Sequence, residues 1–469
     1  MTIFIRRRTV VVAVVLAAIT VAVHGAEKPL DRSAWLDSAV TSTSDDPRRV
    51  PVPKGYNEPK GTVVIRNARL FDGTGTKPRV VTILIAGSYI AKIVPATEGF
   101  AVPEGGEVLD VQGKTVMPGL IDLHTHLTYV DSSGDNEASQ ADATLRGMER
   151  LRYYLESGIT SVRDVASDGE APFVLKRWVA DGRIPGPRVF AAGALITGVG
   201  GHGAESNSAH TAPHYPEAAI YEANGPDGFR LAVREQFKRG ADLIKLASHF
   251  SAEEVSAAVD EAHSLGLKVT VDSETIYTQR AVEAGVDCVE HPLPRSDETI
   301  RMMAKKGICA DITLVPYQYI NATGGYNFSS SRRFTLTDAS IFAMARKLDS
   351  AGIKIGIGTD LVVGWYRYLP DAYLQELRNY QELGHKPAEA LVAATRTNAQ
   401  ILGMADRIGT AEVGKLADLI IVDGHPDESL EELKKIEFVV VNGRVLVRGG
   451  RVFIPRHILE KAPYSNAPG

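Results

Sequence analysis

From about residue 116, strand-like and helix-like stretches alternate along this sequence, and this alternation limits the possible folds more than any other feature. Short apolar runs, many rich in β-branched residues, are separated by stretches with helical periodicity. We predict strands at residues 119–127, 158–165, 188–196, 242–248, 267–273, 286–291, 308–314 and 354–360. The clearest predicted helices span residues 137–156, 252–265, 340–351 and 387–402. This order predicts an α/β fold, a parallel (β/α)8 TIM barrel over residues 116–403.

The predicted helix at residues 252–265 also carries signals for its two ends. Ser251 and Glu254 have the spacing of an N-terminal capping box, in which each side chain accepts a hydrogen bond from the other residue's backbone. Gly266 follows the last apolar position and is a typical stop. These signals predict a helix bounded on both sides.

The segments on either side of the predicted barrel have a different pattern. Residues 61–115 and 404–455 contain short β-branched runs separated by glycine-rich turns. The predicted strands are residues 62–67, 80–85, 89–93, 416–422, 438–442 and 444–447. We expect the two segments to form one small, discontinuous β-sandwich domain.

The N-terminus resembles a targeting segment. Arg6, Arg7 and Arg8 precede an uncharged, mostly apolar run at residues 9–23, and Ala26 offers a small residue for cleavage. We interpret residues 1–26 as a signal peptide, which predicts a periplasmic or secreted protein with no stable membrane span after cleavage. An uncleaved anchor is the alternative, although the run is short for a span. Residues 27–60 are interpreted as a leader arm and residues 456–469 as a C-terminal tail.

Overall charge and cysteine content exclude some functions and leave others open. The 52 basic and 57 acidic residues are mixed along 469 residues and give a net charge of −5, which offers no electrostatic basis for nucleic-acid binding. The two cysteines, Cys288 and Cys309, lie on neighbouring predicted strands. One disulfide and two reduced thiols in the core are both consistent with this placement.

Residues with metal-binding chemistry lie at or near the ends of several predicted strands. In a strand, residues two apart face the same way, so His124 and His126 would present two imidazoles side by side. The other strand-end candidates are Lys245, Asp272, Glu274, Glu290, His291 and Asp360. Because active sites of (β/α)8 barrels form at the carboxyl ends of the strands, these side chains are expected to converge.

Two of these residues suggest specific chemistry. Lys245 lies in an apolar strand, where a lysine is rarely buried without a partner. A lysine of lowered pKa can add CO₂ and become an anionic carbamate that bridges two metal ions, and a buried ion pair with an aspartate is the alternative. Asp360 could bind metal and accept a proton from water, or serve only as a helix N-cap.

Taken together, several motifs resemble the amidohydrolase superfamily, in the branch similar to imidazolonepropionase-like and prolidase-like enzymes. The resemblance covers roughly residues 60–455. It rests on MPGLIDLHTH at residues 117–126, GITSVRD at 158–164, IPGPR at 184–188, GADLIK at 240–245, AGVDCVEH at 284–291, GTD at 358–360 and GKLAD at 414–418.

The resemblance implies two divalent metal ions, usually Zn²⁺. By position, His124, His126 and Asp360 would hold one ion. Lys245, as a CO₂-derived carbamate, would bridge to a second ion that His291 would also bind. Asp360 would act as general base and acid.

At one position the sequence departs from the family pattern, because Asp272 stands where a histidine is expected. Asp272 could ligate the second ion and make harder ions such as Mn²⁺ more plausible. Alternatively His249 could replace the missing imidazole, or only one ion binds. We expect Asp272 to be a ligand.

Loops after the strands are expected to contact the substrate. The glycine-rich segment at residues 198–203 could bring His202 over the mouth of the barrel. Tyr317 and Tyr366 follow the seventh and eighth predicted strands, and Tyr319, Arg367 and Tyr368 lie nearby. Ordinary loop packing is the alternative for each of them.

These observations predict a metal-dependent hydrolase of C–N (amide) bonds that acts on a small molecule, a dipeptide or an N-acyl amino acid by resemblance. A deaminase or cyclic-amide hydrolase with the same site is one alternative. A non-catalytic binding barrel, motivated by Asp272, is another. A homo-oligomer is compatible with the sequence.

Overall fold

The computed structural model describes residues 61–98, 101–129, 139–204, 219–322, 336–362 and 364–454. The predicted signal peptide, leader arm and C-terminal tail lie outside these ranges. Within them, the longest apolar helical stretches are too short or too polar to cross a membrane.

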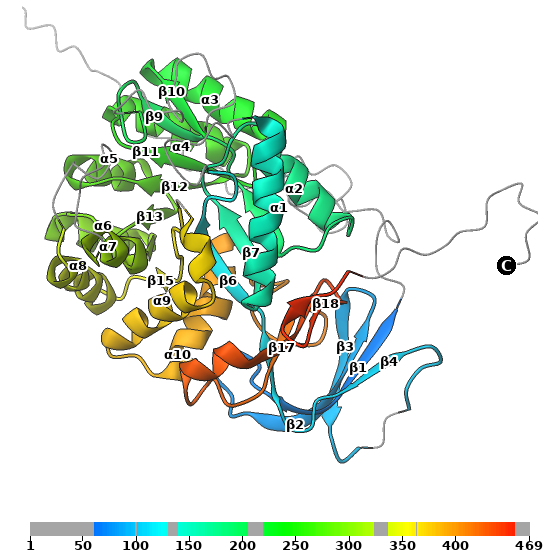
Figure 1. Cartoon of the computed structure of the whole chain (residues 1–469). Helices are drawn as coiled ribbons and strands as arrows, with labels where there is room; N and C mark the ends of the chain where they lie inside the picture. The colour runs from blue at the N-terminus through cyan, green and yellow to red at the C-terminus, as the bar shows by residue number, and fades with distance from the viewer. Residues whose placement is uncertain are drawn as a thin grey trace, which may run out of the picture.

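Parallel strands form two hydrogen-bonded sheets at the centre of the α/β part (Figure 1). The first has the order β6 (Leu120–Thr125), β7 (Ile159–Asp164), β8 (Arg188–Ala191). The second has the order β10 (Ile220–Ala223), β9 (Leu195–Gly198), β11 (Leu243–Ala247), β12 (Lys268–Asp272), β13 (Cys288–Glu290), β14 (Cys309–Asp311), β15 (Ile355–Gly356). Parallel pairing throughout agrees with the α/β prediction.

Several details differ from the predicted strands. The last two predicted strands are shorter than expected, at Cys309–Asp311 and Ile355–Gly356, and a helix begins at Leu314. The run at residues 188–196 is two strands, β8 and β9, because Gly193 between them has a left-handed backbone (φ 78°). A Cβ at Gly193 would lie 2.2 Å from the Gln236 side chain, so the chain turns where only glycine fits. Strand β10 is short and polar and was not predicted.

Helices follow most of these strands and lie outside them, as the green helices of Figure 1 show. They are α1 (Gln140–Glu156), α2 (Ala171–Ala180), α3 (Gly225–Arg239), α4 (Ala252–Ser264), α5 (Thr275–Ala284), α6 (Asp297–Lys306), α7 (Leu314–Ala322), α8 (Asp338–Ser350), α9 (Asp371–Glu382), α10 (Pro387–Val392) and α11 (Asn398–Leu402). The capping box of Ser251 and Glu254 at the start of α4 is confirmed.

Alternation along the strands decides which side chains reach the interior. On β12, Val269 and Val271 pack in the apolar cluster shared with helix α4, so Thr270 and Asp272 face the other side. On β11, Ile244 packs in the same apolar cluster, so Lys245, the next residue, faces inward. The side of the strands away from the helices therefore carries the polar residues.

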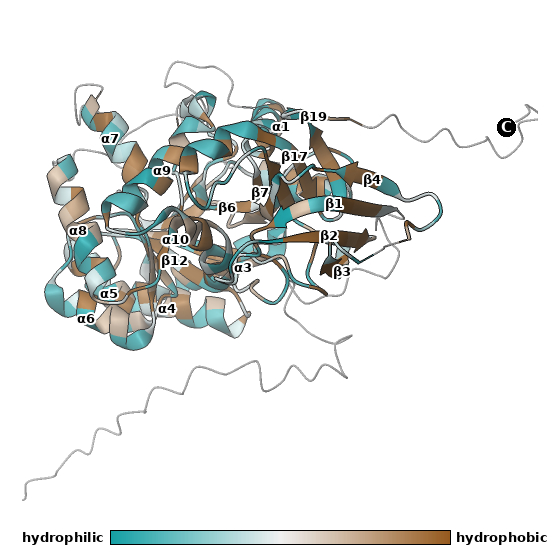
Figure 2. Cartoon of the chain, turned by 90° about the horizontal axis from the view of Figure 1, so that it is seen from below, coloured by the Kyte–Doolittle hydropathy of each residue, from teal (hydrophilic) through white to brown (hydrophobic). Residues whose placement is uncertain are grey.

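The N- and C-terminal segments meet in one nine-stranded sheet, shown by the blue and red strands of Figure 1. Its strands are β1 (Thr62–Leu70), β2 (Arg79–Ala86), β3 (Tyr89–Pro95), β4 (Glu107–Asp110), β5 (Thr115–Pro118), β16 (Leu419–Val422), β17 (Ile436–Val441), β18 (Arg444–Arg448) and β19 (Arg451–Val452). Antiparallel pairing of β5 with β16 joins the two segments. Figure 2 shows hydrophobic stretches in β2, β3 and β17, and the buried cluster of this sheet includes Ile83, Val116 and Leu419.

Candidate metal centre

His124 and His126 lie at the carboxyl end of β6, and both are buried. Their Nε2 atoms approach the same carboxylate oxygen, Asp360 Oδ1, at 3.5 Å from His124 and 3.0 Å from His126. The other ring nitrogen of His126, Nδ1, lies 3.0 Å from the Ala166 carbonyl oxygen, and this contact orients the ring. Two imidazoles from one strand therefore face one carboxylate, as the two-residue spacing predicts.

Backbone contacts between β6 and the segment after β15 bring Asp360 to this position. The backbone N–H of Asp360 donates to the His124 carbonyl (2.8 Å), and that of Leu123 donates to the Ile357 carbonyl (3.1 Å). Asp360 itself has a left-handed backbone (φ 47°). Burial acts to raise the pKa of the Asp360 carboxyl, but the nearby imidazoles of His124 and His126 outweigh it and lower this pKa. Asp360 is therefore ionised at neutral pH.

Lys245, on β11, is almost fully buried, and its Nζ lies 3.5 Å from His124 Nε2. Burial and the charge of Lys245 lower the pKa of His124 to about 3. His124 is therefore a neutral imidazole over the physiological range, which is the form that binds metal.

A second polar group lies around Asp272, at the end of β12. Its Oδ2 atom is 3.2 Å from His291 Nε2 and 2.9 Å from His202 Nε2. His291 follows β13 with a left-handed backbone (φ 62°), and its Nδ1 lies 2.7 Å from Thr313 Oγ1. Burial acts to raise the pKa of Asp272, but the two histidines outweigh it and hold this pKa well below its usual range.

The group around Asp360 and the group around Asp272 are adjacent. The rings of His124 and His291 have centroids 4.8 Å apart, and His291 Nδ1 is 3.9 Å from Asp360 Oδ2. Single ligand atoms of His124, His291 and Asp360 all lie within 4.8 Å of one another. All six predicted metal-site residues (His124, His126, Lys245, Asp272, His291 and Asp360) thus belong to one connected cluster.

Beneath this cluster lies a charged pair formed by Glu290, one of the strand-end candidates, and Arg163, for which the sequence indicates no role. Glu290 Oε2 is 2.8 Å from His124 Nδ1, and Glu290 Oε1 accepts hydrogen bonds from Arg163 (2.7 Å) and from the Thr270 hydroxyl. Burial acts to raise the pKa of Glu290, but the charges of Arg163 and Lys245 hold it well below its usual range. Neighbouring residues of a strand face opposite sides. Because Val289 on β13 faces the helices, Glu290 faces the interior, and this alternation is the sequence signal for its contact with His124.

The structure places the other candidates as follows. Tyr317 meets the His291 ring edge-on, with centroids 5.9 Å apart. Tyr366 is buried; its hydroxyl donates to the His126 carbonyl (2.5 Å), and its ring lies 3.8 Å from the Arg150 guanidinium carbon. These contacts of Tyr366 are structural.

His249 and Glu274, two further candidates near Asp272, contact other residues. His249 lies against the ring of Tyr277, with centroids 4.8 Å apart. Glu274 Oε2 accepts a hydrogen bond from the Ser248 hydroxyl (3.0 Å). His202 is the histidine in direct contact with Asp272.

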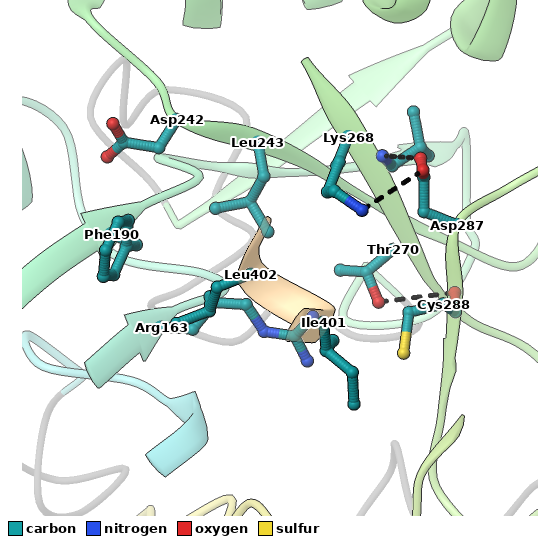
Figure 3. A pocket seen from close by; sticks show the side chains of 11 residues that line it. Arg163, Phe190, Asp242, Leu243, Lys268, Thr270, Asp287, Cys288, Ile401 and Leu402 are labelled. Carbon is teal, nitrogen blue, oxygen red and sulfur yellow. Dashed lines mark hydrogen bonds and ion pairs between the residues drawn. The ribbon is translucent and has the colours of Figure 1, made fainter. Parts of the chain in front are cut away.

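A cavity at the opposite, amino ends of the strands is distinct from this cluster (Figure 3). It is lined by Arg163, Phe190, Asp242, Leu243, Lys268, Val269, Thr270, Asp287, Cys288, Ile401 and Leu402. Lys268 and His263 both contact the Asp287 carboxylate there, at 3.7 and 2.9 Å.

Cys288 and Cys309 are opposite each other on β13 and β14, and both are free thiols.

The donor chemistry of the cluster fits a divalent metal ion. Imidazole nitrogens and carboxylate oxygens bind Zn²⁺ at about 2.0–2.2 Å, which places neighbouring tetrahedral ligands about 3.3–3.6 Å apart. The separations of 3.5, 3.2 and 3.0 Å between the histidine nitrogens and the two carboxylates are close to this spacing. Fold and site together define an α/β protein with a candidate metal-binding site at the carboxyl ends of its parallel strands.

Comparison with known proteins identifies the family. Residues 115–446 match the amidohydrolase family, and the chain belongs to it. The chain is 28% identical over 393 residues to imidazolonepropionase of Geobacillus sp. (strain WCH70), covering 74% of this chain and 84% of that protein. It is 26% identical over 377 residues to ochratoxinase of Aspergillus niger, covering 72% and 75%.

Solved structures agree with this assignment. A prolidase in complex with N-methylphosphonate-L-proline is similar with a TM-score of 0.72 and 28% identity, covering 82% of this chain and all of that one. A Xaa-Pro dipeptidase with bound methionine is similar with a TM-score of 0.70 and 26% identity, again covering 82% and 100%. The protein is therefore an amidohydrolase, a metal-dependent hydrolase acting on C–N bonds.

Proposed function

We propose that this protein hydrolyses the amide bond of a dipeptide or an N-acyl amino acid. The observation that carries the proposal is the ionised Asp360 carboxylate, held between the imidazoles of His124 and His126 at the carboxyl ends of the strands. Support for the substrate class comes from the similar structures of a prolidase and a Xaa-Pro dipeptidase.

The resemblance of residues 1–26 to a signal peptide supports a periplasmic or secreted location.

We assign the metal ligands as follows. His124, His126 and Asp360 hold one divalent ion, Zn²⁺ by preference, with Mn²⁺ as the alternative. Lys245, as a carbamate, would supply oxygen ligands shared by the two ions, and Asp272 and His291 would also hold the second ion. The short distance from Lys245 Nζ to His124 Nε2 supports the bridge.

When bound, the ions polarise the substrate carbonyl and acidify a water molecule. Asp360 accepts a proton from that water and donates it to the leaving nitrogen, a role that its ionised state and its position permit. Burial of the two histidines and Lys245 excludes bulk water from the reacting groups, which strengthens their electrostatic interactions.

We also propose that the parallel strands close into one (β/α)8 barrel and that the nine-stranded sheet folds into a two-layer sandwich. The parallel bridge between Thr125 and Leu361, together with the hydrogen bond from Leu123 to Ile357, supports closure between the first and last strands. The domain boundaries drawn from the sequence stay predictions.

Hydrolysis of a cyclic amide is the second candidate. The match to imidazolonepropionase over 74% of the chain favours it. The two candidates share the chemistry of the site and differ in the shape of the substrate.

The test is product release from a panel of Xaa-Pro dipeptides, N-acyl amino acids and cyclic amides, measured by mass spectrometry with the metal-loaded protein. We expect at least one linear amide to be cleaved, and Asp360→Asn to reduce turnover by about 10²–10⁴-fold because the proton acceptor is lost. Asp297→Asn, a change at an exposed ion pair on α6, is the control. Cleavage of cyclic amides alone would favour the second candidate, and no cleavage by metal-loaded protein would leave a binding barrel.

A further inference from the structure

We propose that His202 is a ligand of the second metal ion, so that this ion is bound by His202, Asp272 and His291. The inference rests on the proposed metal-dependent function and assigns to His202 a role other than substrate contact. It concerns a site built from three separate segments: the loop after β9, the end of β12 and the residue after β13.

The geometry around Asp272 carries the proposal. Both histidines direct Nε2 at the same carboxylate oxygen, Oδ2, at 2.9 Å for His202 and 3.2 Å for His291. Asp272 and His291 are almost fully buried, and His202 is partly exposed. Two imidazoles and one carboxylate form a common donor set for Zn²⁺. An ion between them requires the three atoms to open by a few tenths of an ångström toward the spacing of about 3.3–3.6 Å expected for neighbouring ligands.

Hydrogen bonding on His291 is compatible with both the empty and the loaded site. Thr313 Oγ1 lies 2.7 Å from His291 Nδ1, and a hydroxyl can donate or accept. In one tautomer, Nε2–H would donate to Asp272 and Nδ1 would accept from Thr313. In the other, Nδ1–H would donate to Thr313, and the Nε2 lone pair would be available to a metal ion. Such a partner on the far ring nitrogen is the usual way to orient a metal-binding histidine.

The loop that carries His202 is fixed by its glycines. The His202 backbone N–H donates to the Ser248 carbonyl, and Gly198 N–H donates to the His249 carbonyl at 2.9 Å. A Cβ at Gly201 would lie 2.6 Å from the His249 backbone nitrogen, and one at Gly198 would lie 2.1 Å from the His249 carbonyl oxygen. These glycines therefore allow the loop to pack on residues 248–249, and this contact places His202 beside Asp272.

The register of the sheet places Lys245 next to this donor set. Ala247 on β11 is directly opposite Asp272 on β12, and Lys245 is two residues earlier on the same side of β11. Because Lys245 Nζ is also 3.5 Å from His124 Nε2, it lies between the two groups of ligands. The His202 site is thus adjacent to Lys245, the bridge proposed between the two ions.

The test is the stoichiometry of metal binding, measured by titrating Zn²⁺ into metal-free, full-length protein in bicarbonate buffer and following the heat. We expect two binding steps in the parent. In His202→Gln the second step should weaken at least tenfold while the first is unchanged. His202→Cys, which keeps a zinc ligand, should retain the second step.

The matched control is His263→Gln, because His263 makes the same 2.9 Å contact between Nε2 and a carboxylate, that of Asp287, at the amino ends of the strands. It should leave both steps unchanged. Loading with Mn²⁺ provides a second readout: electron paramagnetic resonance should detect two spin-coupled ions in the parent and uncoupled ions in His202→Gln.

Two results would overturn the inference. If His202→Gln binds both ions with the affinities of the parent, His202 is not a ligand. If the parent binds a single ion, the second site does not form, whereas amide hydrolysis by that one-ion protein would leave the proposed function intact.

Discussion

At the scale of single residues, the site depends on unusual backbone conformations at strand ends. His291 and Asp360 both have positive φ, at 62° and 47°, which costs a residue with a Cβ about 1–2 kcal/mol. The turn at His291 lets two consecutive residues, Glu290 and His291, both reach the cluster, which a continuing strand would not allow. Backbone strain of this kind is concentrated at functional sites.

Glu290 is predicted to orient His124 for metal binding. Its ionised carboxylate accepts a hydrogen bond from the His124 Nδ1–H, a tautomer that leaves the Nε2 lone pair facing Asp360 and Lys245. We expect Glu290→Gln to weaken binding of the first ion by about 10–100-fold, measured by competition with a chelator. Glu431→Gln, at an exposed ion pair, is the control. Unchanged affinity in folded Glu290→Gln protein would show that the tautomer is fixed in another way.

Lys245 is predicted to need CO₂ for its role. Metal-free protein given Zn²⁺ in bicarbonate should regain more bound metal and more activity than in CO₂-free buffer. Lys245→Arg, which cannot carry a carbamate, should respond equally in both buffers, and Lys268→Arg should behave as the parent. A ¹³C resonance from labelled bicarbonate, present in the parent and absent in Lys245→Arg, identifies the modified side chain. Equal recovery of the parent in both buffers contradicts the carbamate.

At the scale of secondary-structure elements, buried carboxylates connect helices. Glu376 on α9 accepts hydrogen bonds from the backbone N–H groups of Leu314 and Val315, each at 2.9 Å, at the start of α7. These N–H groups have no partner within their own helix, so Glu376 satisfies them from a neighbouring helix. Burial raises the pKa of Glu376 to about 7 despite these hydrogen bonds.

This shift predicts how stability depends on pH. In the folded protein Glu376 keeps its proton up to a pH of about 7, whereas in the unfolded chain it loses it near its usual pKa of 4.5. Its contribution to stability is therefore complete below pH 4.5, declines as pH rises to 7 and is then constant. We expect the free energy of unfolding of the parent, relative to that of Glu376→Gln, to fall by roughly 3 kcal/mol between pH 4.5 and pH 8. Urea denaturation at both pH values checks this, and a constant difference would contradict it.

At the scale of the whole molecule, the nine-stranded sheet and the parallel strands share a buried apolar cluster, which includes Ile159, Ile420 and Val439, and polar contacts add to it. Asp418, just before β16, is buried and accepts hydrogen bonds from Arg188 on β8 (3.0 Å) and from the Asn442 backbone (2.6 Å). Chain continuity adds a second connection, because β5 runs through Gly119 into β6. Asp418 therefore links the two parts of the fold at a distance from the metal cluster.

Loss of this link should destabilise the protein without altering metal binding. We expect Asp418→Ala to lower the free energy of unfolding by about 2–4 kcal/mol, because it leaves Arg188 and a backbone N–H without their acceptor. Asp297→Ala, which removes an exposed ion pair with Lys347, should change it by less than about 1 kcal/mol. A loss of metal affinity in folded Asp418→Ala would show that the two parts are coupled.

Local patterns in the sequence are enough to predict helix α4 and the chemistry at several strand ends. Helical spacing and the capping box defined α4, and alternation placed His124 and His126 on one side of β6, because both signals lie within a few residues of the chain. Motifs around Lys245 and Asp360 indicated the family, to which residues 115–446 do belong.

Tertiary structure alone decided which of these residues meet. The contact of Asp272 with His202 depends on how a glycine-rich loop packs on residues 248–249, and the contact of His124 with Glu290 joins residues 166 positions apart. The split between β8 and β9 at Gly193 likewise follows from the packing of Gln236 against it. Local periodicity records which way a side chain faces, whereas its partner is set by the order and register of strands brought together from the whole chain.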